Sequence, residues 1–187
     1  VSGSISRMPE PLESLAVWSV ATGMISIFRN PGVAYNEAVV ALLEEPHAFQ
    51  ALRKFAARAA LAILAIATLF VATPLSKGWF IVIANLPYDR AEIARHALVL
   101  AIPITALSVY ISLYQGIVVQ QEKTKPVAEA VIIFLLTLTA IMVAGVISKS
   151  FMGVYVAAFG YTIAHMAQGL WLLFRSRRQR KSLVSCE

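Results

Sequence analysis

The stretch from Leu15 to Leu43 reads LAVWSVATGMISIFRNPGVAYNEAVVALL, and it decides how the rest of the chain must fold. Its roughly 29 residues are mostly apolar and, at about 1.5 Å per residue, long enough to cross a bilayer. Arg29 lies at the midpoint, and Pro31 follows two residues later. A charge deep in a membrane is costly, and a proline leaves one backbone carbonyl without its helical partner. The stretch therefore predicts a proline-bent spanning helix that lines a polar path.

An alternative divides this stretch at Arg29–Gly32 into a helix over residues 12–28 and a separate piece over residues 33–43. The second piece, at about 11 residues, is too short to span a bilayer. We therefore expect one bent helix. Pro103, in a later apolar stretch, is expected to bend its own helix for the same reason.

The composition places the chain among multi-pass membrane proteins. Of its 187 residues, 59% are hydrophobic and 14% are charged, whereas a soluble domain carries about 25% charged residues. The net charge of +6 comes from basic residues at the ends of apolar runs, which argues against a nucleic-acid partner. The single cysteine, Cys186, provides neither a disulfide framework nor a metal cluster.

Five apolar stretches have the length of membrane spans. A polar lead-in precedes them at residues 1–13, where two prolines argue against a helix, and a basic tail follows at residues 175–187. Residues 47–58 form an amphipathic pattern typical of a helix lying in the membrane interface. The expected fold is an all-α membrane bundle over residues 14–174, with spans at about 15–43, 59–80, 97–120, 127–147 and 153–174.

The distribution of basic residues predicts the orientation. One side of the predicted bundle holds Arg53, Lys54, Arg58, Lys123, Lys125, Arg175, Arg177, Arg178, Arg180 and Lys181. The other side holds only Arg7, Lys77, Arg90, Arg95 and Lys149. Cytoplasmic loops of membrane proteins contain more Lys and Arg than loops on the other side. We therefore expect an inner (plasma) membrane protein whose C-terminus is cytoplasmic and whose N-terminus is outside. An odd number of spans without a signal peptide leads us to expect a preceding span in a longer protein.

Two stretches carry a resemblance to a known family: YQGIVVQQEKTKPVAEAVIIFLL at residues 114–136 and GVYVAAFGYTIAHMAQGLWLLFR at residues 153–175. They resemble the end of one half of a transporter of the multidrug and toxic compound extrusion (MATE) type. This type belongs to the superfamily of multidrug, oligosaccharidyl-lipid and polysaccharide (MOP) exporters. The matching features are Gly116, the basic turn Lys123-Thr124-Lys125-Pro126, Gly153 and Arg175.

The resemblance implies two six-helix halves around a central cavity, of which this chain would supply helices two to six of the C-terminal half. The sequence departs from the family pattern at two places. Gln121-Glu122 stands where a Gly-Asp pair is common, and Glu44-Glu45-Pro46 replaces a Gly-rich turn. Transporters of this family bind the coupling cation with acidic residues, and in this sequence only Glu37 has a position that suggests a counterpart of them.

Arg29, Asn30 and Glu37 are the first group of candidate site residues. Asn30 and Glu37 are seven residues apart and share a helix face. Arg29 offers five donors and suits a carboxylate, phosphate or sulfonate, while Glu37 is a candidate carrier of a coupling proton. The alternative is that Arg29 and Glu37 neutralise one another or satisfy the backbone freed by Pro31.

Two further groups lie on later spans. Tyr161, His165 and Gln168 share a face of the last span, where the imidazole either contacts substrate and protons or acts as an interhelical hydrogen-bond partner. Tyr110, Tyr114 and Gln115 either line the same cavity, where rings suit amphipathic substrates, or pack near the interface. Lys125 and Glu129, one turn apart, are expected to form an ordinary ion pair.

Together with these features, the resemblance implies a secondary active transporter, an antiporter-type exporter or flippase. It would move an amphipathic or lipid-linked substrate by proton- or sodium-coupled alternating access. Its partners would be the lipid bilayer and either a missing N-terminal half or a second membrane chain. The alternative is a non-transporting membrane subunit that packs against a larger complex. The sequence has no phosphate-binding loop, zinc-binding His pair or nucleophile elbow, so we expect no enzymatic activity, metal or organic cofactor.

Overall fold

The computed structural model describes residues 1–43, 48–120 and 125–184, the side chains of the last segment being described as far as Ser176. Helices make up 90% of it and the described residues form no strand, so the expected all-α membrane bundle is confirmed. Five of its helices are long and apolar enough to cross a membrane. In chain order the elements are α1 (Ser2–Ile5), α2 (Pro11–Leu42), α3 (Ala48–Ala72), α4 (Leu75–Gly78), the π-helical turn η1 (Trp79–Ile83), α5 (Tyr88–Gln120), α6 (Lys125–Ser148) and α7 (Gly153–Val184).

The stretch around Arg29 is one continuous helix. α2 runs through Pro31 from a proline in its first turn, a position where the missing N–H has no cost. The expectation of a single helix is therefore confirmed, and the division into pieces over 12–28 and 33–43 is wrong. α5 likewise continues past Pro103.

The second span differs from its expected bounds. The interfacial helix expected at 47–58 and the span expected at 59–80 are replaced by α3, a single helix that ends at Ala72. Arg53 and Lys54 are exposed, and long basic side chains reach the interface while their stems remain against apolar surface, so the helix need not break. Pro74 follows the helix end, and Arg95 Nε donates to the Val71 carbonyl at 3.0 Å, which satisfies one of the free acceptors there.

Two segments expected to be irregular are partly helical. The lead-in at residues 1–13 contains α1 and the start of α2, with Ile5 and Met8 buried. The polar connection before the third span is helical from Tyr88, so α5 extends well beyond the expected 97–120. Glu92 in its first turns pairs with Lys77 at 2.5 Å, and this hydrogen bond raises the pKa of Lys77. The charge pairing explains why a polar sequence continues the helix here.

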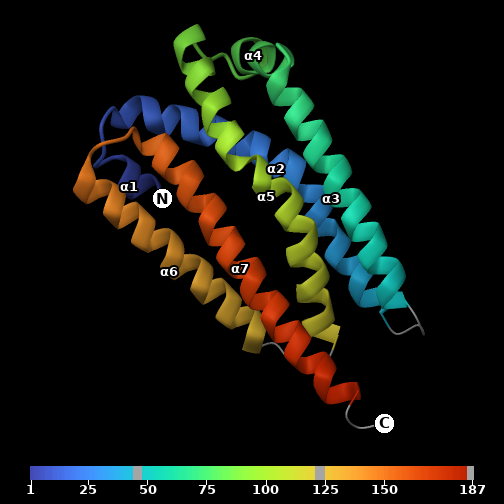
Figure 1. Cartoon of the computed structure of the whole chain (residues 1–187). Helices are drawn as coiled ribbons and strands as arrows, with labels where there is room; N and C mark the ends of the chain where they lie inside the picture. Colours follow the sequence, from blue (N-terminus) through green and yellow to red (C-terminus); the bar gives the residue numbers. More distant parts are fainter. Residues whose placement is uncertain (44–47, 121–124, 185–187) are drawn as a thin grey trace.

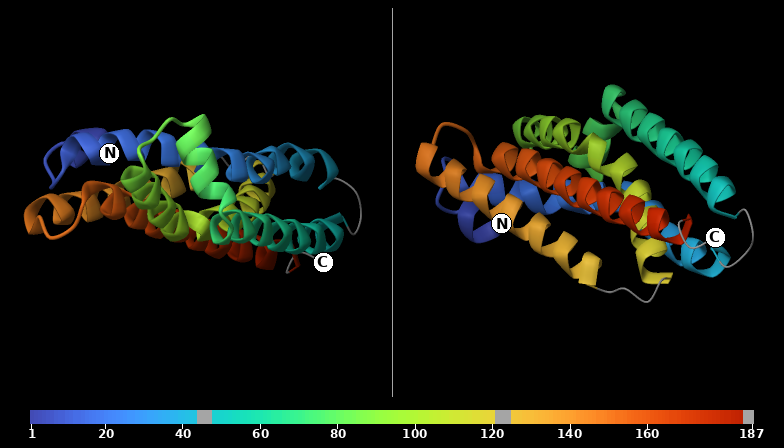
Figure 2. Two further views of the ribbon diagram at one scale, coloured as in Figure 1. Left: turned by 90° about the horizontal axis from the view of Figure 1, so that it is seen from above. Right: turned by 60° about the horizontal axis from the view of Figure 1, so that its bottom comes forward.

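The five long helices run alternately up and down (Figure 1). α2, α5 and α7 form the centre of the bundle, α3 packs against α5, and α6 packs against α7 (Figure 2). In α5, 56% of the most apolar window is buried inside the protein, compared with 22% in α3 and in α6. α5 is therefore the core helix, and the outer faces of α3 and α6 are left to lipid.

Two glycines allow α2 and α5 to approach closely. A Cβ atom added at Gly32 would collide with the Ser108 hydroxyl and lie 3.0 Å from the Val109 backbone nitrogen. A Cβ atom added at Gly116 would lie 2.6 Å from Cγ1 of Val39 on the other helix. Small residues at a helix interface let backbones come together in a membrane, where packing rather than water drives association. These glycines fix which face of α2 meets α5.

The helix ends lie at the two ends of the bundle in the way that the predicted orientation requires. The last turns of α2, α5 and α7 lie at one end of the bundle with the first turns of α3 and α6 (Figure 1). The described side chains of the larger basic group that lie toward this end are Arg53, Lys54, Arg58, Lys125 and Arg175. The described members of the larger basic group therefore lie toward the same end of the bundle, as expected. The cytoplasmic location of this end stays a prediction.

Candidate functional site

A polar cavity of about 300 Å³ lies among α2, α5 and α7. Arg29 is near the midpoint of α2, and His165 is near the midpoint of its span Gly153–Ser176. The cavity is therefore close to the centre of the membrane-spanning region. Its lining residues are Arg29, Val33, Asn36, Glu37, Ser108, Ile111, Ser112, Gln115, His165 and Gln168.

Arg29 reaches across to α7. Its Nη1 atom donates to the Tyr161 hydroxyl at 2.9 Å and lies 3.4 Å from His165 Nε2. His165 Nδ1 lies 2.9 Å from the Tyr161 carbonyl oxygen. A carbonyl only accepts, so Nδ1 carries the ring proton and Nε2 is left as the acceptor for Arg29. The three residues form a connected network with a neutral imidazole.

Aromatic packing holds this network in place. The Tyr161 ring centroid lies 5.6 Å from that of Phe134 and 6.1 Å from that of Trp18, both in edge-on geometry. The His165 ring packs against Phe134 at 4.7 Å, and only 6% of His165 is exposed. Side chains from α2, α6 and α7 thus fix the rings that orient Arg29.

Among the described residues, no acidic side chain forms an ion pair with Arg29. Glu37 lines the same cavity, but the described part of the chain contains no ion pair between the two residues. The hydrogen-bond partners that the described part of the chain offers the guanidinium, Tyr161 and His165, are neutral. A guanidinium has five donors, so this one can still bind an anion that enters the cavity.

α2 presents a different asparagine from the one expected. Asn30 is exposed and does not line the cavity. Asn36 does, and its Nδ2 donates to the Ser112 carbonyl at 3.0 Å. Sequence reasoning missed Asn36, although it stands seven residues after Arg29 and hence on nearly the same helix face.

α5 contributes a short polar stripe. Gln115, for which lining the cavity was one of two alternatives, does line it, together with Ser108 and Ser112, which sequence reasoning missed. The spacing of 108, 112 and 115 follows one helix face and was the available signal. Gln168 and His165 on α7 share the cavity, and Tyr161 contributes through its hydrogen bond to Arg29.

Tyr110 and Tyr114 lie elsewhere. They line a separate cavity of about 690 Å³ between α5 and α3. Adjacent residues on a helix point about 100° apart, so Tyr114 and Gln115 face different neighbours. The structure therefore does not bring the two tyrosines together with Arg29.

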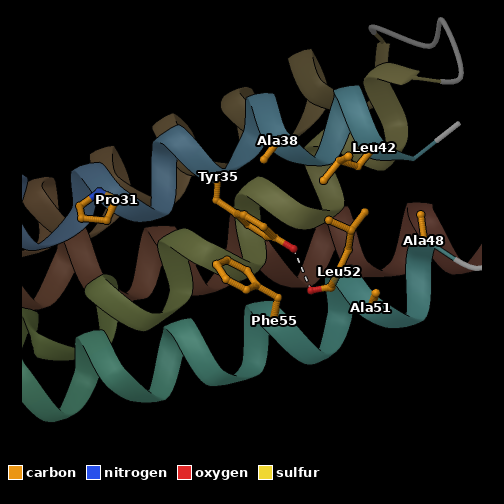
Figure 3. Close-up of a pocket in the computed structure, with 8 residues that line it drawn as sticks. All are labelled: Pro31, Tyr35, Ala38, Leu42, Ala48, Ala51, Leu52 and Phe55. Carbon is orange, nitrogen blue, oxygen red and sulfur yellow. Dashed lines mark hydrogen bonds between the residues drawn. The ribbon is translucent and has the colours of Figure 1, made fainter. Parts of the chain in front are cut away.

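A third hollow, between α2 and α3, is apolar (Figure 3). Pro31 and Tyr35 line it from α2, and Leu52 and Phe55 line it from α3. The Tyr35 hydroxyl is already used, because it donates to the Leu52 carbonyl at 2.7 Å. This groove of about 610 Å³ suits lipid chains, so the cavity around Arg29 is the better candidate for polar chemistry.

The expected pair between Lys125 and Glu129 is wrong. Glu129 instead binds Arg175 of α7, whose Nη2 donates to Oε1 at 2.7 Å and whose Nε donates to Oε2 at 3.0 Å. Trp171 Nε1 donates to the same carboxylate at 3.2 Å. A planar guanidinium makes two parallel contacts with a carboxylate, which a lysine cannot do. This contact joins α6 to α7.

Comparison with known proteins returned no match: no protein-family model, no curated protein and no solved structure matches the chain. In the part of the chain that the structure describes, no group of three or more His, Cys, Asp or Glu side chains is placed to hold a metal ion. The fold and the site define the class: a multi-pass helical membrane protein with a polar cavity between three of its spans.

Proposed function

We propose that this chain forms part of a secondary transporter of the MATE-like type. It moves an amphipathic or lipid-linked substrate with an anionic group by ion-coupled alternating access. One observation carries the proposal: the guanidinium of Arg29 lies midway along apolar spans, in a polar cavity, and its hydrogen-bond partners among the described residues are neutral. Placing a charge at that depth costs free energy, and bundles retain such residues mainly where they bind or conduct.

The cavity supplies both parts of a substrate site. Arg29 binds the anionic group of the substrate, and the amides of Gln115 and Gln168 offer donors and acceptors around it. Glu37 lies on the same wall and is the carboxylate that takes up the coupling proton or sodium ion. Occupation of Glu37 by a cation changes the electrostatic potential at Arg29, so ion and substrate affect each other's binding.

The other wall of the translocation path comes from a second six-helix half, which lies either in the same protein or in a second membrane chain. The protein resides in the inner membrane, with the basic tail of α7 in the cytoplasm. The two halves rock around the site so that the cavity opens to each side in turn.

The test is flux in vesicles that contain the complete protein. The probes are a phospholipid with a fluorescent headgroup, followed by quenching from outside, and radiolabelled inorganic phosphate, each with an imposed pH or sodium gradient. We expect flux of at least one probe above that of protein-free vesicles, accelerated by one of the gradients. Flux of both probes equal to that of protein-free vesicles under every gradient contradicts the proposal.

Replacing Glu37 with glutamine should remove the acceleration by the gradient and leave the gradient-free flux within about threefold. The amide has nearly the same shape as the carboxylate, but it carries no negative charge and cannot take up or release a coupling proton. The matched control is Glu10→Gln, since Glu10 is an exposed carboxylate outside the cavity. Glu37 has no part in coupling if the Glu37→Gln protein responds to the gradient as strongly as the control.

A non-transporting subunit is the second candidate function. It is favoured by the outer faces of α3 and α6, where only 22% of each apolar window is buried inside the chain. Such faces accept partner helices as readily as lipid. A subunit would show no flux and would copurify in a fixed ratio with another membrane protein, whereas the transporter shows flux after purification.

A further inference from the structure

The cavity between α3 and α5 is a second site whose chemistry differs from that around Arg29. It has a volume of about 690 Å³, and no acidic residue is among its lining residues. Those residues are Phe49, Gln50, Arg53, Lys54, Ala57, Tyr110 and Tyr114. Two adjacent positive charges and two phenols, with no acidic side chain among the described lining residues, form a site for an anion.

The polar groups of this cavity are unused in the described part of the chain. Arg53 and Lys54 are exposed and take part in no ion pair there. Tyr110 and Tyr114 are one helical turn apart on α5, so their side chains lie on the same face. Their hydroxyls make no hydrogen bond to a described residue. The cavity thus offers cationic and neutral donors to one ligand.

The depth of the cavity fits a lipid headgroup. Arg53 and Lys54 follow the first residue of α3 by roughly 8 Å along the helix axis, at about 1.5 Å per residue. Their extended side chains reach the interface from there. This is the end of the bundle where the basic ends of α6 and α7 lie, which are the ends expected to face the anionic leaflet (Figure 1).

We propose that this cavity binds the phosphate of an anionic phospholipid from the leaflet at that end. The guanidinium of Arg53 and the ammonium of Lys54 contact the phosphate oxygens, and the hydroxyls of Tyr110 and Tyr114 donate to them. The face of α3 that lines the cavity continues as apolar surface, with Leu61, one turn after Ala57, 67% exposed. Acyl chains attached to the phosphate lie along that surface, which a free phosphate ion cannot use.

The site acts on the helix pair that it bridges. α3 lies at the periphery and contacts the core mainly through α5. A phospholipid bound to both helices therefore stabilises the seating of α3 on the bundle. This role does not depend on transport, so the lipid-binding proposal can be tested independently of the proposed function.

The test uses the complete protein in a zwitterionic detergent and follows the midpoint of thermal unfolding as lipid is added. Phosphatidylglycerol should raise the midpoint by several degrees in a saturable manner, while phosphatidylcholine, with the same phosphate but no net charge, should have little effect. Inorganic phosphate at the same concentration should have none. If inorganic phosphate raises the midpoint as much as phosphatidylglycerol, the site binds the free ion and the proposal is wrong.

The decisive variant is Arg53→Gln/Lys54→Gln, which should weaken phosphatidylglycerol binding at least tenfold. The charge-matched control is Arg58→Gln/Lys125→Gln, because both residues are exposed near the same end and neither lines the cavity. Equal binding by the two double variants overturns the proposal. Should Arg53→Gln/Lys54→Gln fail to fold, Tyr110→Phe/Tyr114→Phe keeps the rings and should weaken binding a few-fold; unchanged binding in that variant also overturns it.

Discussion

Replacing Gly32 with alanine is expected to destabilise the bundle by about 2 kcal/mol or more, the range for overpacking a tight interface. The added methyl group would meet the Ser108 hydroxyl and the Val109 backbone nitrogen, which lies 3.0 Å from its position. Because the Val109 nitrogen is main chain, it cannot turn aside, and α2 and α5 must separate. The expected result is a lower midpoint of thermal unfolding in detergent.

Gly23→Ala is the matched control for this prediction, since Gly23 lies on the same helix and has nothing within 4 Å of an added Cβ atom. Alanine favours helix over glycine by up to about 1 kcal/mol, so this variant should be neutral or slightly more stable. Gly116→Ala tests the same interface from α5, where Val39 blocks the added methyl group. Equal midpoints for Gly32→Ala and Gly23→Ala would contradict the close approach of α2 to α5.

The second large effect is expected from Arg29→Leu, which should reduce substrate flux at least 30-fold at a matched amount of folded protein. Losing a charged contact to a desolvated anion costs about 2–5 kcal/mol, and about 1.4 kcal/mol corresponds to a factor of ten. Arg29→Lys should retain part of the flux, because it keeps the charge but not the planar pair of donors. The measurement is the initial rate in vesicles for the probe that the unaltered protein moves.

Two variants separate binding by Arg29 from its contribution to the fold. Arg7→Leu removes an exposed arginine outside the cavity and should leave the flux unchanged. Tyr161→Phe removes the 2.9 Å hydrogen bond to Arg29 but keeps the ring and the positive charge, so flux should fall only a few-fold. An Arg29→Leu protein with a normal unfolding midpoint and unreduced flux would remove Arg29 from the mechanism.

The sequence was sufficient to predict a single long helix around Arg29. A piece over residues 33–43 cannot span a bilayer alone, and the apolar length on both sides of Pro31 outweighs the breaking tendency of the proline. The same reasoning from length failed for α3. There the amphipathic start looked like a separate interfacial helix, but side chains such as Arg53 reach the interface without a break in the backbone.

The composition of the site could be predicted only in part, because packing sets the rotation of each helix. Gly32 faces α5, and a residue two positions away lies about 200° around the helix, which turns Asn30 outward. Asn36, four positions after Gly32, is only about 40° from the same face and lines the cavity. Sequence spacing shows which residues share a face, but only the partner helix shows which face is inside.

Contacts between residues far apart in the sequence could not be predicted from the sequence either. Glu129 has a lysine one turn away in sequence, yet it binds Arg175 from the next helix. The bond between Arg29 and Tyr161 likewise joins residues on α2 and α7. Each of these contacts depends on how two spans pack against each other, and a local sequence pattern does not predict that packing.

We infer that a polar cavity reachable from water lies midway along the spans of this protein. The most direct measurement replaces Val33, which lines the cavity one turn after Arg29, with cysteine in a Cys186→Ser background and follows its modification by a membrane-impermeant methanethiosulfonate reagent in sealed vesicles. The thiol must ionise to react, which requires water. Leu61→Cys is the control, because Leu61 is 67% exposed near the middle of the lipid-facing helix α3. We predict modification at position 33 at least tenfold faster than at position 61; equally slow modification at both positions would contradict this inference.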